Sequence, residues 1–139
     1  MKVVRFNDAE RYEPEADWKR VSLCNEVDIS IEHFTKPPHH ASPKHEHVNV
    51  QVLVVLKGRL AIELEDGSEQ SLEEGDAAYI PGGESHIVKN LLNTPSIGLD
   101  IFVPGRSFDF WLRRKAESRN ANESPEGMED PPQAEDPRT

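Results

Sequence analysis

The chain has 139 residues, a single cysteine and a formal net charge of −10 at pH 7. This length is typical of one domain with a substantial hydrophobic core. The acidic balance argues against nucleic-acid binding, which needs a basic surface, and no apolar run is long enough to span a bilayer. Because Cys24 has no partner for a disulfide and the first residues do not resemble a secretory signal, we expect a cytoplasmic protein.

The first third of the chain predicts short strands separated by polar loops. Residues 12–17 contain Pro14 and predict a loop, whereas residues 18–23 predict a strand. Apolar and polar residues alternate over residues 27–33, which is typical of a half-buried strand with its apolar side chains toward the core. His33 lies on that apolar side, and we expect it to be packed or hydrogen-bonded rather than to bind a metal.

A proline-rich loop is predicted for residues 35–44. Pro37, Pro38 and Pro43 remove backbone donors and favour extended backbone. His39 and His40 lie in this loop and suggest a second metal pair, but we do not expect one, because the histidines that follow have better ligand spacing.

The strand predicted for residues 45–57 organises the rest of the chain. Side chains of a strand alternate between its faces, so His45, His47 and Gln51 share one face with apolar residues such as Leu53. One face thus carries two imidazoles and an amide at the end of an otherwise apolar strand. These ligand types suit one divalent transition metal, such as Fe, Mn, Ni, Zn or Co.

Further strands and tight turns follow. Residues 60–64 and 68–72 predict a hairpin around Asp66-Gly67. Residues 77–80 predict another strand, and Pro81-Gly82-Gly83 predicts a tight turn shortly before His86. Many short strands without intervening helices indicate an all-β sandwich or barrel.

Two stretches of the chain resemble the motifs of the cupin superfamily. The first motif, G-x5-H-x-H-x(3,4)-E-x6-G, is matched by His45, His47 and Gly58, with Gln51 in place of Glu and His39 in place of the opening Gly. The second motif, G-x5-P-x-G-x2-H-x3-N, is matched in full by Gly75, Pro81, Gly83, His86 and Asn90. The resemblance implies a double-stranded β-helix of jelly-roll type, a homodimer, and a metal held by His45, His47, Gln51 and His86.

The glutamine affects the chemistry expected of such a site. Four protein ligands would leave two positions of an octahedral ion open. A neutral Gln51 leaves the full charge of a divalent ion in place, which strengthens its attraction to anionic ligands and disfavours Fe(III). The alternative is a cupin whose ligands no longer bind a metal, which the three histidines disfavour.

A second group of candidate residues lies at the end of the last predicted strand, residues 97–103. Asp100 and Phe102 share one face, and Arg106 follows. If that face looks inward, Asp100 could act as a general acid or base, and Arg106 could hold a substrate carboxylate. The ordinary alternative is that Asp100 pairs with Arg106 and Phe102 only packs.

This D-x-F-x-P-x-R pattern resembles small bacterial cupins of the KdgF type, which open the ring of 4,5-unsaturated uronates. The resemblance implies a small anionic, sugar-like substrate, an isomerase or lyase type of reaction, and catalytic or binding roles for Asp100, Phe102 and Arg106. The family tends to continue Arg-Glu-Asp-Phe-Leu and stop, whereas this chain departs from that sequence after Arg106 and is longer. An Fe(II)-dependent dioxygenase and a non-catalytic ligand-binding cupin are the two alternatives.

The C-terminal part divides into a short helix and a tail. Residues 108–115 predict a helix with Phe108, Trp111 and Leu112 on its apolar side. Residues 116–139 are rich in acids and proline and contain hardly an apolar residue, so we expect a disordered tail after a cupin domain of residues 1–115.

Overall fold

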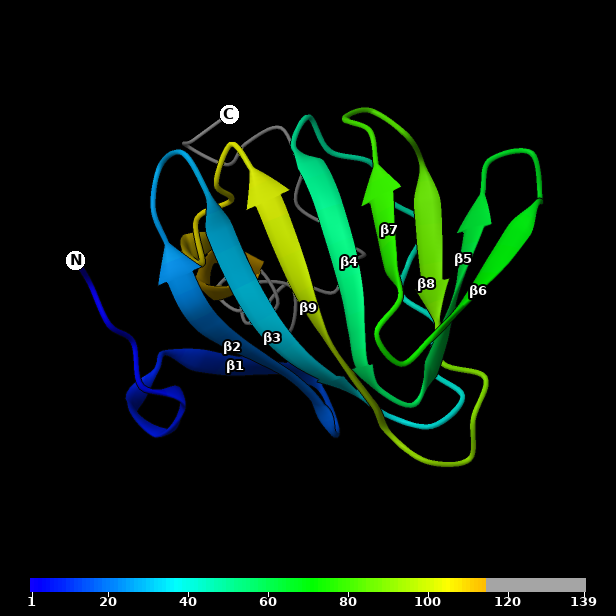
Figure 1. The fold of residues 1–139 in the computed structure, drawn as a ribbon, viewed down its shortest axis with the longest axis horizontal. Coiled ribbons are helices and arrows are strands. Elements are labelled where there is room, and N and C mark those ends of the chain that lie inside the picture. Colours follow the sequence, from blue (N-terminus) through cyan, green and yellow to red (C-terminus); the bar gives the residue numbers. More distant parts are fainter. Residues whose placement is uncertain (115–139) are drawn as a thin grey trace, which may run out of the picture.

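Two antiparallel sheets make up most of the computed structural model, which describes residues 1–114 (Figure 1). The larger sheet has the strand order β1-β2-β3-β9-β4-β7 and the smaller one β6-β5-β8. The strands are β1 (Arg11–Glu15), β2 (Trp18–Asn25), β3 (Ser30–Lys36), β4 (Val50–Lys57), β5 (Arg59–Leu64), β6 (Glu69–Glu73), β7 (Ala77–Ile80), β8 (His86–Lys89) and β9 (Ser96–Val103), preceded by a 3-10 turn, η1 (Phe6–Asp8). This is the double-stranded β-helix predicted from the motifs.

The residues before β4 correct one predicted boundary. The predicted strand began at His45, but β4 begins at Val50, and only a single bridge pairs His45 with His86. The backbone nevertheless keeps the alternation of a strand, because His47 and Gln51 are buried while Val48 is exposed. The predicted face is therefore confirmed, although the regular strand starts later than expected.

The predicted loop at residues 12–17 is wrong over most of its length. Residues Arg11–Glu15 form β1, which pairs with β2 at the edge of the larger sheet. An edge strand tolerates Pro14 because its missing N–H costs no ladder hydrogen bond. The register of the pairing shifts between Tyr12 and Glu15.

The faces of β3 are inverted relative to the prediction. Ser30, Glu32 and Lys36 are buried inside the barrel, whereas Ile31 and His33 are half-buried on its outer side. The expectation failed because this interior contains charged groups and the outer face of the larger sheet is apolar. His33 packs its ring edge-on against Phe6, at 4.9 Å between ring centroids, in agreement with its predicted packing role.

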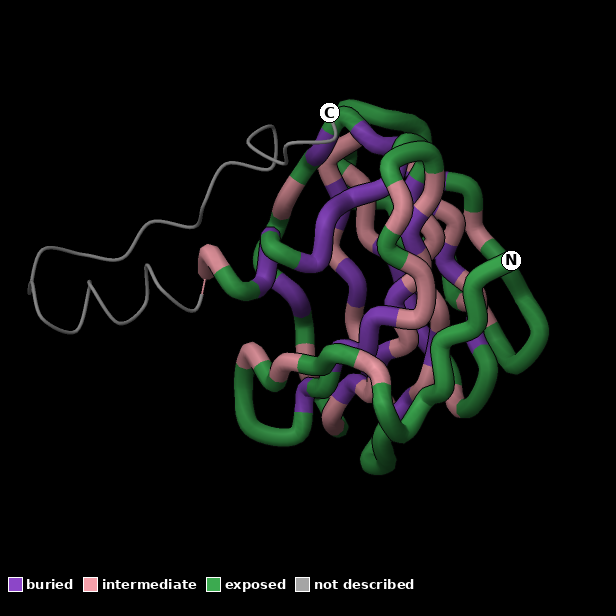
Figure 2. The backbone as a smooth tube through the Cα atoms, turned by 90° about the vertical axis from the view of Figure 1, so that its left-hand side faces the viewer, coloured by how far each residue is buried: buried purple, intermediate pink, exposed green. Residues whose placement is uncertain are grey.

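Two hydrophobic clusters hold the fold together. The first packs the two sheets against each other and contains Phe34, Leu53, Val55, Leu60, Ile62, Ile80 and Val88. Figure 2 shows how buried positions alternate with less buried ones along the strands of the two sheets. The second cluster contains Trp18, Phe108, Phe110 and Trp111 and holds the C-terminal helical residues, 109–114, against β2. The short helix predicted from residue 108 is thus confirmed.

Within residues 1–114, no helix is long and apolar enough to cross a membrane. The predicted acidic tail, residues 116–139, and the predicted domain boundary after residue 115 lie outside the described residues.

Candidate metal site and its cavity

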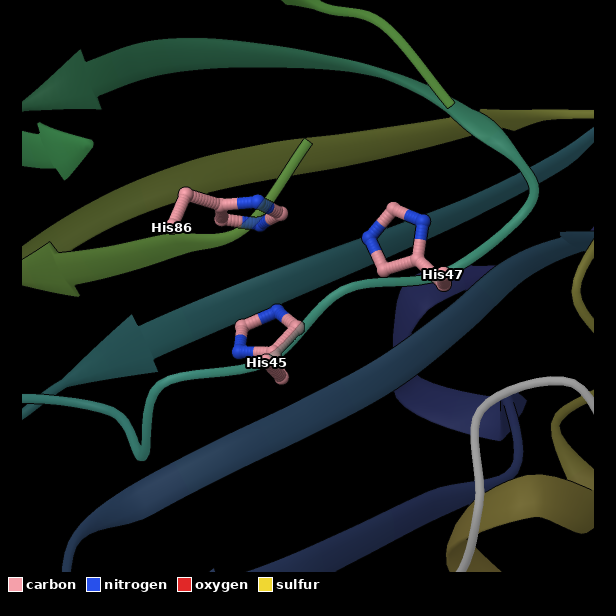
Figure 3. A group of neighbouring side chains, drawn as sticks. All are labelled: His45, His47 and His86. Atoms are coloured by element: carbon pink, nitrogen blue, oxygen red, sulfur yellow. The ribbon is translucent and has the colours of Figure 1, made fainter. Parts of the chain in front are cut away.

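Three histidines from two separate segments point toward one another (Figure 3). His45 and His47 lie in the segment before β4, and His86 is the first residue of β8 in the smaller sheet. One nitrogen atom of each lies within 4.8 Å of the others. Reciprocal backbone hydrogen bonds of 3.0 and 3.2 Å between His45 and His86 hold the two segments together.

The backbone fixes the tautomer of all three rings. Each Nδ1 lies 2.8 or 2.9 Å from a carbonyl oxygen two residues away, of Pro43 for His45, of Asn49 for His47 and of Glu84 for His86. A carbonyl only accepts, so Nδ1 carries the hydrogen, and Nε2 of each neutral ring keeps its lone pair. In His86 this Nε2 is buried and has no hydrogen-bond partner within the described structure. Such an arrangement prepares the three Nε2 atoms for a metal ion.

The surroundings also keep two of these rings uncharged. Burial, and next the charge of His86, lowers the pKa of His45 to about 3. Burial, and next the charge of Arg106, lowers the pKa of His47 to about 4. At neutral pH both rings are therefore neutral, which is the form that binds a metal.

Gln51 adds an oxygen to the three nitrogens. Its Nε2 donates to Oδ1 of Asp100 at 2.7 Å, which settles the orientation of the amide. Its Oε1 then lies 3.0 Å from Nε2 of His47, and two acceptors face each other with no hydrogen between them. Metal–ligand bonds of about 2.1 Å at right angles place neighbouring ligand atoms about 3 Å apart. The residues present therefore fit a divalent metal ion.

Asp100 and Arg106 lie in the same region but do not pair with each other as the ordinary alternative expected. The second oxygen of Asp100 accepts from Nη2 of Arg20 at 2.8 Å. Arg106 instead donates to Oε2 of Glu32 at 3.2 Å, and its guanidinium lies 4.1 Å from the ring centroid of Phe102. Arg20 thus bridges Asp100 and Glu32, whereas Arg106 pairs with Glu32.

A cavity of about 400 Å³ opens beside the histidines. Of the predicted site residues, His45, Gln51, Asp100, Phe102 and Arg106 line it. The cationic side chains around it are Arg20, Lys36, Lys44, Arg106 and Arg114, and the aromatic ones are Trp18, Phe34, Phe102, Phe110 and Trp111. A volume of this order suits a small molecule, and the excess of cations favours an anionic one.

A buried acid that was not predicted from the sequence, Glu32, connects several side chains around the cavity. Oε1 of Glu32 accepts from Nη2 of Arg20 at 2.8 Å and from Nε1 of Trp111 at 2.7 Å, and Oε2 accepts from Arg106. Burial raises the pKa of Glu32, but the charges of Arg106 and Arg20 outweigh burial and lower the pKa overall. Glu32 lies two residues before Phe34 and so shares a face with it, which was a usable signal, but the partners of Glu32 lie up to 79 residues away in the sequence.

The second histidine pair makes other contacts. His39 bonds through Nε2 to Oδ1 of Asn93 at 2.7 Å, whereas His40 contacts Nζ of Lys36 and Oε2 of Glu15. Neither belongs to the histidine cluster formed by His45, His47 and His86.

The fold and the histidine cluster define a cupin, and comparison with known proteins agrees. Residues 32–102 match the family model described as Cupin domain, and the chain belongs to this family. A curated relative, an uncharacterized protein of Methanocaldococcus jannaschii, is 28% identical over 69 residues, which cover 50% of this chain and 60% of that relative.

Solved structures of other cupins have the same fold. KdgF from Halomonas sp. superposes with a TM-score of 0.69 and 22% identity, covering 76% of this chain and 96% of that one. The polyketide cyclase RemF from Streptomyces resistomycificus has a TM-score of 0.64 and 20% identity, covering 74% of this chain and 79% of that one. Likeness at these identities concerns the fold.

Proposed function

We propose that this protein is a metal-dependent, non-redox enzyme that acts on a small anionic sugar-like substrate, and that ring opening of a 4,5-unsaturated uronate is its reaction. The observation that carries the proposal is the convergence of three imidazole Nε2 atoms and the Gln51 amide oxygen beside a cation-lined cavity. The fold likeness to KdgF and the Asp100, Phe102 and Arg106 pattern at the cavity support the choice of substrate.

In this proposal His45, His47, Gln51 and His86 hold one divalent ion. When bound, such an ion supplies Lewis acidity toward a substrate oxygen. All four ligands are neutral, so they leave the charge of the ion undiminished and add to the preference of the cavity for anions. Phe102 packs edge-on against His47, at 5.4 Å between ring centroids, and limits how that ring can turn.

Asp100 and Arg106 act on the substrate. Arg106 lines the cavity, and we assign it the substrate carboxylate, which a guanidinium binds through two parallel hydrogen bonds. Ring opening moves a proton from the anomeric hydroxyl to C4. The bond between C1 and the ring oxygen breaks, C1 becomes an aldehyde, and the C4=C5 double bond is replaced by a ketone at C5. We assign this proton transfer to Asp100, the carboxylate beside Gln51.

NMR of the metal-loaded protein with 4,5-unsaturated galacturonate tests the proposal. The open-chain keto product should form faster than in a control treated with a chelator. Replacing Asp100 with Ala should lower the rate at least about a hundredfold, as removal of a general acid or base does. His39→Gln, outside the cavity, should leave the rate unchanged. Unchanged turnover in Asp100→Ala would refute the role of Asp100.

The two alternative functions give different readouts on the same sample. An Fe(II) dioxygenase would consume oxygen in proportion to substrate loss, which a non-redox ring opening does not. A non-catalytic binding cupin would bind the uronate tightly and return it unchanged.

We further propose that two copies of the chain pair through the outer face of the larger sheet. This face carries a row of apolar side chains that are only half-buried or exposed, namely Ile31, Val50, Val52, Val54, Leu56, Ile97, Leu99 and Ile101. Apolar patches of this kind mark protein–protein contacts, and a symmetric dimer buries the same patch on both partners.

We also propose a cytoplasmic location. Cys24 is the single cysteine of the sequence, is a half-buried free thiol, and lies 3.7 Å from the carbonyl oxygen of Ile29. A chain without disulfides is in keeping with a reducing compartment.

A further inference from the structure

Lys36 is a buried lysine that the proposed reaction does not use. It is the last residue of β3, only 2% exposed, and it lines the cavity. Its Nζ lies 5.0 Å from the ring centroid of Trp18. No carboxylate among the described residues forms an ion pair with it; its hydrogen-bond partner is His40 Nδ1, at 2.6 Å. A lysine is rarely buried without a carboxylate partner, which makes this amine unusual.

The contacts of Lys36 continue to the protein surface. His40 Nε2 lies 2.5 Å from Oε2 of the exposed Glu15, and a carboxylate accepts, so this nitrogen carries the hydrogen. Nδ1 of the neutral ring therefore accepts from Lys36. A proton that moves from Lys36 to His40 leaves a buried position and forms an imidazolium beside the Glu15 carboxylate. Trp18 packs against the His40 ring, at 4.7 Å between centroids, and keeps it in place.

Burial and the nearby charge of Arg20 favour the loss of a proton from Lys36. Burial, and next the guanidinium of Arg20 on β2, lowers the pKa of Lys36 to about 7, while Asp100 on β9 and Glu15 on β1 act in the opposite direction. The pKa of His40 is also lowered, by burial and next by the charge of Lys36. The effect of the Lys36 charge on His40 disappears when the amine becomes neutral, so the titrations of Lys36 and His40 are coupled.

The register of β3 places Lys36 away from the proposed metal ligands. Glu32 pairs with Asp100 and Lys36 with Ser96 across β3 and β9. These two residue pairs lie four residues apart along the strand, which corresponds to about 13 Å. An open-chain ligand held near Asp100 would therefore direct its other end toward Lys36.

We propose that Lys36 is a nucleophilic amine that takes a carbonyl-bearing organic acid from the cavity as a reversible imine, with His40 and Glu15 as its proton outlet. The Nζ lone pair forms a bond to the carbonyl carbon, and the nitrogen then loses two protons in succession through His40. The first converts the carbonyl oxygen into the hydroxyl of a carbinolamine, and the second leaves with that hydroxyl as water when the C=N bond forms. The inference rests on the proposed function for its natural ligand, because ring opening of a uronate yields such a carbonyl acid.

Reductive trapping with glyoxylate tests this inference on the full-length protein. Glyoxylate is the smallest aldehyde acid, and borohydride converts its imine into a stable carboxymethyl group that peptide mass spectrometry locates. Lys44 is a matched internal control, because it also lines the cavity but pairs with Glu65 at 2.7 Å. At neutral pH we expect Lys36, whose pKa is lowered to about 7 by burial, to be labelled at least about tenfold faster than Lys44, which pairs with Glu65.

Labelling of Lys44 and the surface lysines at the same rate as Lys36 would overturn the inference. His40→Gln removes the proton acceptor and should slow the labelling of Lys36 several-fold at neutral pH. At alkaline pH the labelling rate of this variant should return to that of the wild type. An unchanged rate in His40→Gln would refute the relay. Trapping needs neither a metal nor uronate turnover. A labelled Lys36 in a protein without uronate activity would thus refute only the proposed function, and an unlabelled Lys36 in an active enzyme only this inference.

Discussion

The side-chain amide of Gln51 donates from Nε2 to Oδ1 of Asp100 over 2.7 Å, and this hydrogen bond turns the amide oxygen toward His47. A glutamate at position 51 would present a carboxylate oxygen to Asp100 instead of a donor. The pairing therefore gives a physical reason why an amide occupies this position, where the cupin motif usually has an acid.

Replacing Gln51 with Glu should destabilise the metal-free protein. Two carboxylates at hydrogen-bond distance cannot both be ionised without a large cost, so we expect a loss of about 1–3 kcal/mol at neutral pH. The double variant Gln51→Glu with Asp100→Asn restores a donor toward position 51 and keeps an acceptor for Arg20. Chemical denaturation of the four proteins should give a coupling free energy of at least about 1 kcal/mol. Additive effects would contradict the proposed contact.

Metal binding should raise the melting temperature of the wild-type protein but not that of His86→Gln. An ion that binds only the folded state stabilises it by about 2.7 kcal/mol when its concentration is a hundred times the Kd. His86 supplies the buried Nε2 that has no other partner in the described structure. His39→Gln is the matched control and should keep the thermal shift. An equal shift in His86→Gln would place any bound ion elsewhere.

Replacing Glu32 with Gln should cost about 3–5 kcal/mol of unfolding free energy, because Arg106 would lose the buried charge of Glu32 and Arg20 would lose one of its two buried carboxylate partners, the other being Asp100. The control is Glu63→Gln, which breaks the more exposed pair with Lys89 and should cost at most about 1 kcal/mol. Urea denaturation compares the two variants. A similar small loss in both would mean that the buried cluster contributes little.

The metal-free protein should lose stability as the pH falls from about 6.5 toward 4. The pKa of His47 is lowered to about 4 and that of His45 to about 3 in the folded state, against about 6.5 for an ordinary histidine. Below pH 6.5 the unfolded chain therefore binds protons that the folded protein does not, and unfolding becomes more favourable. The melting temperature in the presence of a chelator measures this effect. His47→Gln should flatten the slope, and an unchanged slope would contradict the assignment.

Replacing Leu99 with Glu should convert the proposed dimer into a monomer. Leu99 lies on the outer face of the larger sheet, opposite Val54 on the neighbouring strand β4. Val27→Glu is the control, because Val27 is 71% exposed and lies outside that face. Sedimentation velocity of both variants and the wild type should show a monomer only for Leu99→Glu. A monomeric wild-type protein would refute the dimer itself.

The cupin fold and the histidine cluster could be predicted from the sequence because both are encoded in short stretches of the chain. His45 and His47 follow a two-residue period, and the second motif places His86 after a glycine turn. Alternation in β9 also predicted correctly that Asp100 and Phe102 share a face. The sequence left open whether that face looks inward, and the burial of both residues shows that it does.

Features that depend on distant pairing could not be predicted. The inverted faces of β3 arise because Glu32 finds Arg20, Arg106 and Trp111 inside the barrel, and none of these is a neighbour in the sequence. The prediction for β3 placed the apolar residues of an alternating strand inward. That rule assumes that water covers the outer face of the sheet and that the interior carries no charges. The edge position of β1, which allows Pro14 in a strand, is likewise a property of the whole sheet.

The orientation of the three imidazoles and the shape of the cavity depend on different chemical groups. Peptide carbonyls orient the imidazoles. A carbonyl group is present whatever side chain its residue carries, so changes of side chain around the cavity leave the ring orientation intact. The shape of the cavity depends instead on side chains such as Trp18, Phe34 and Phe110, which come from other segments. The three imidazoles would therefore keep their orientation in relatives whose cavities have walls of a different shape.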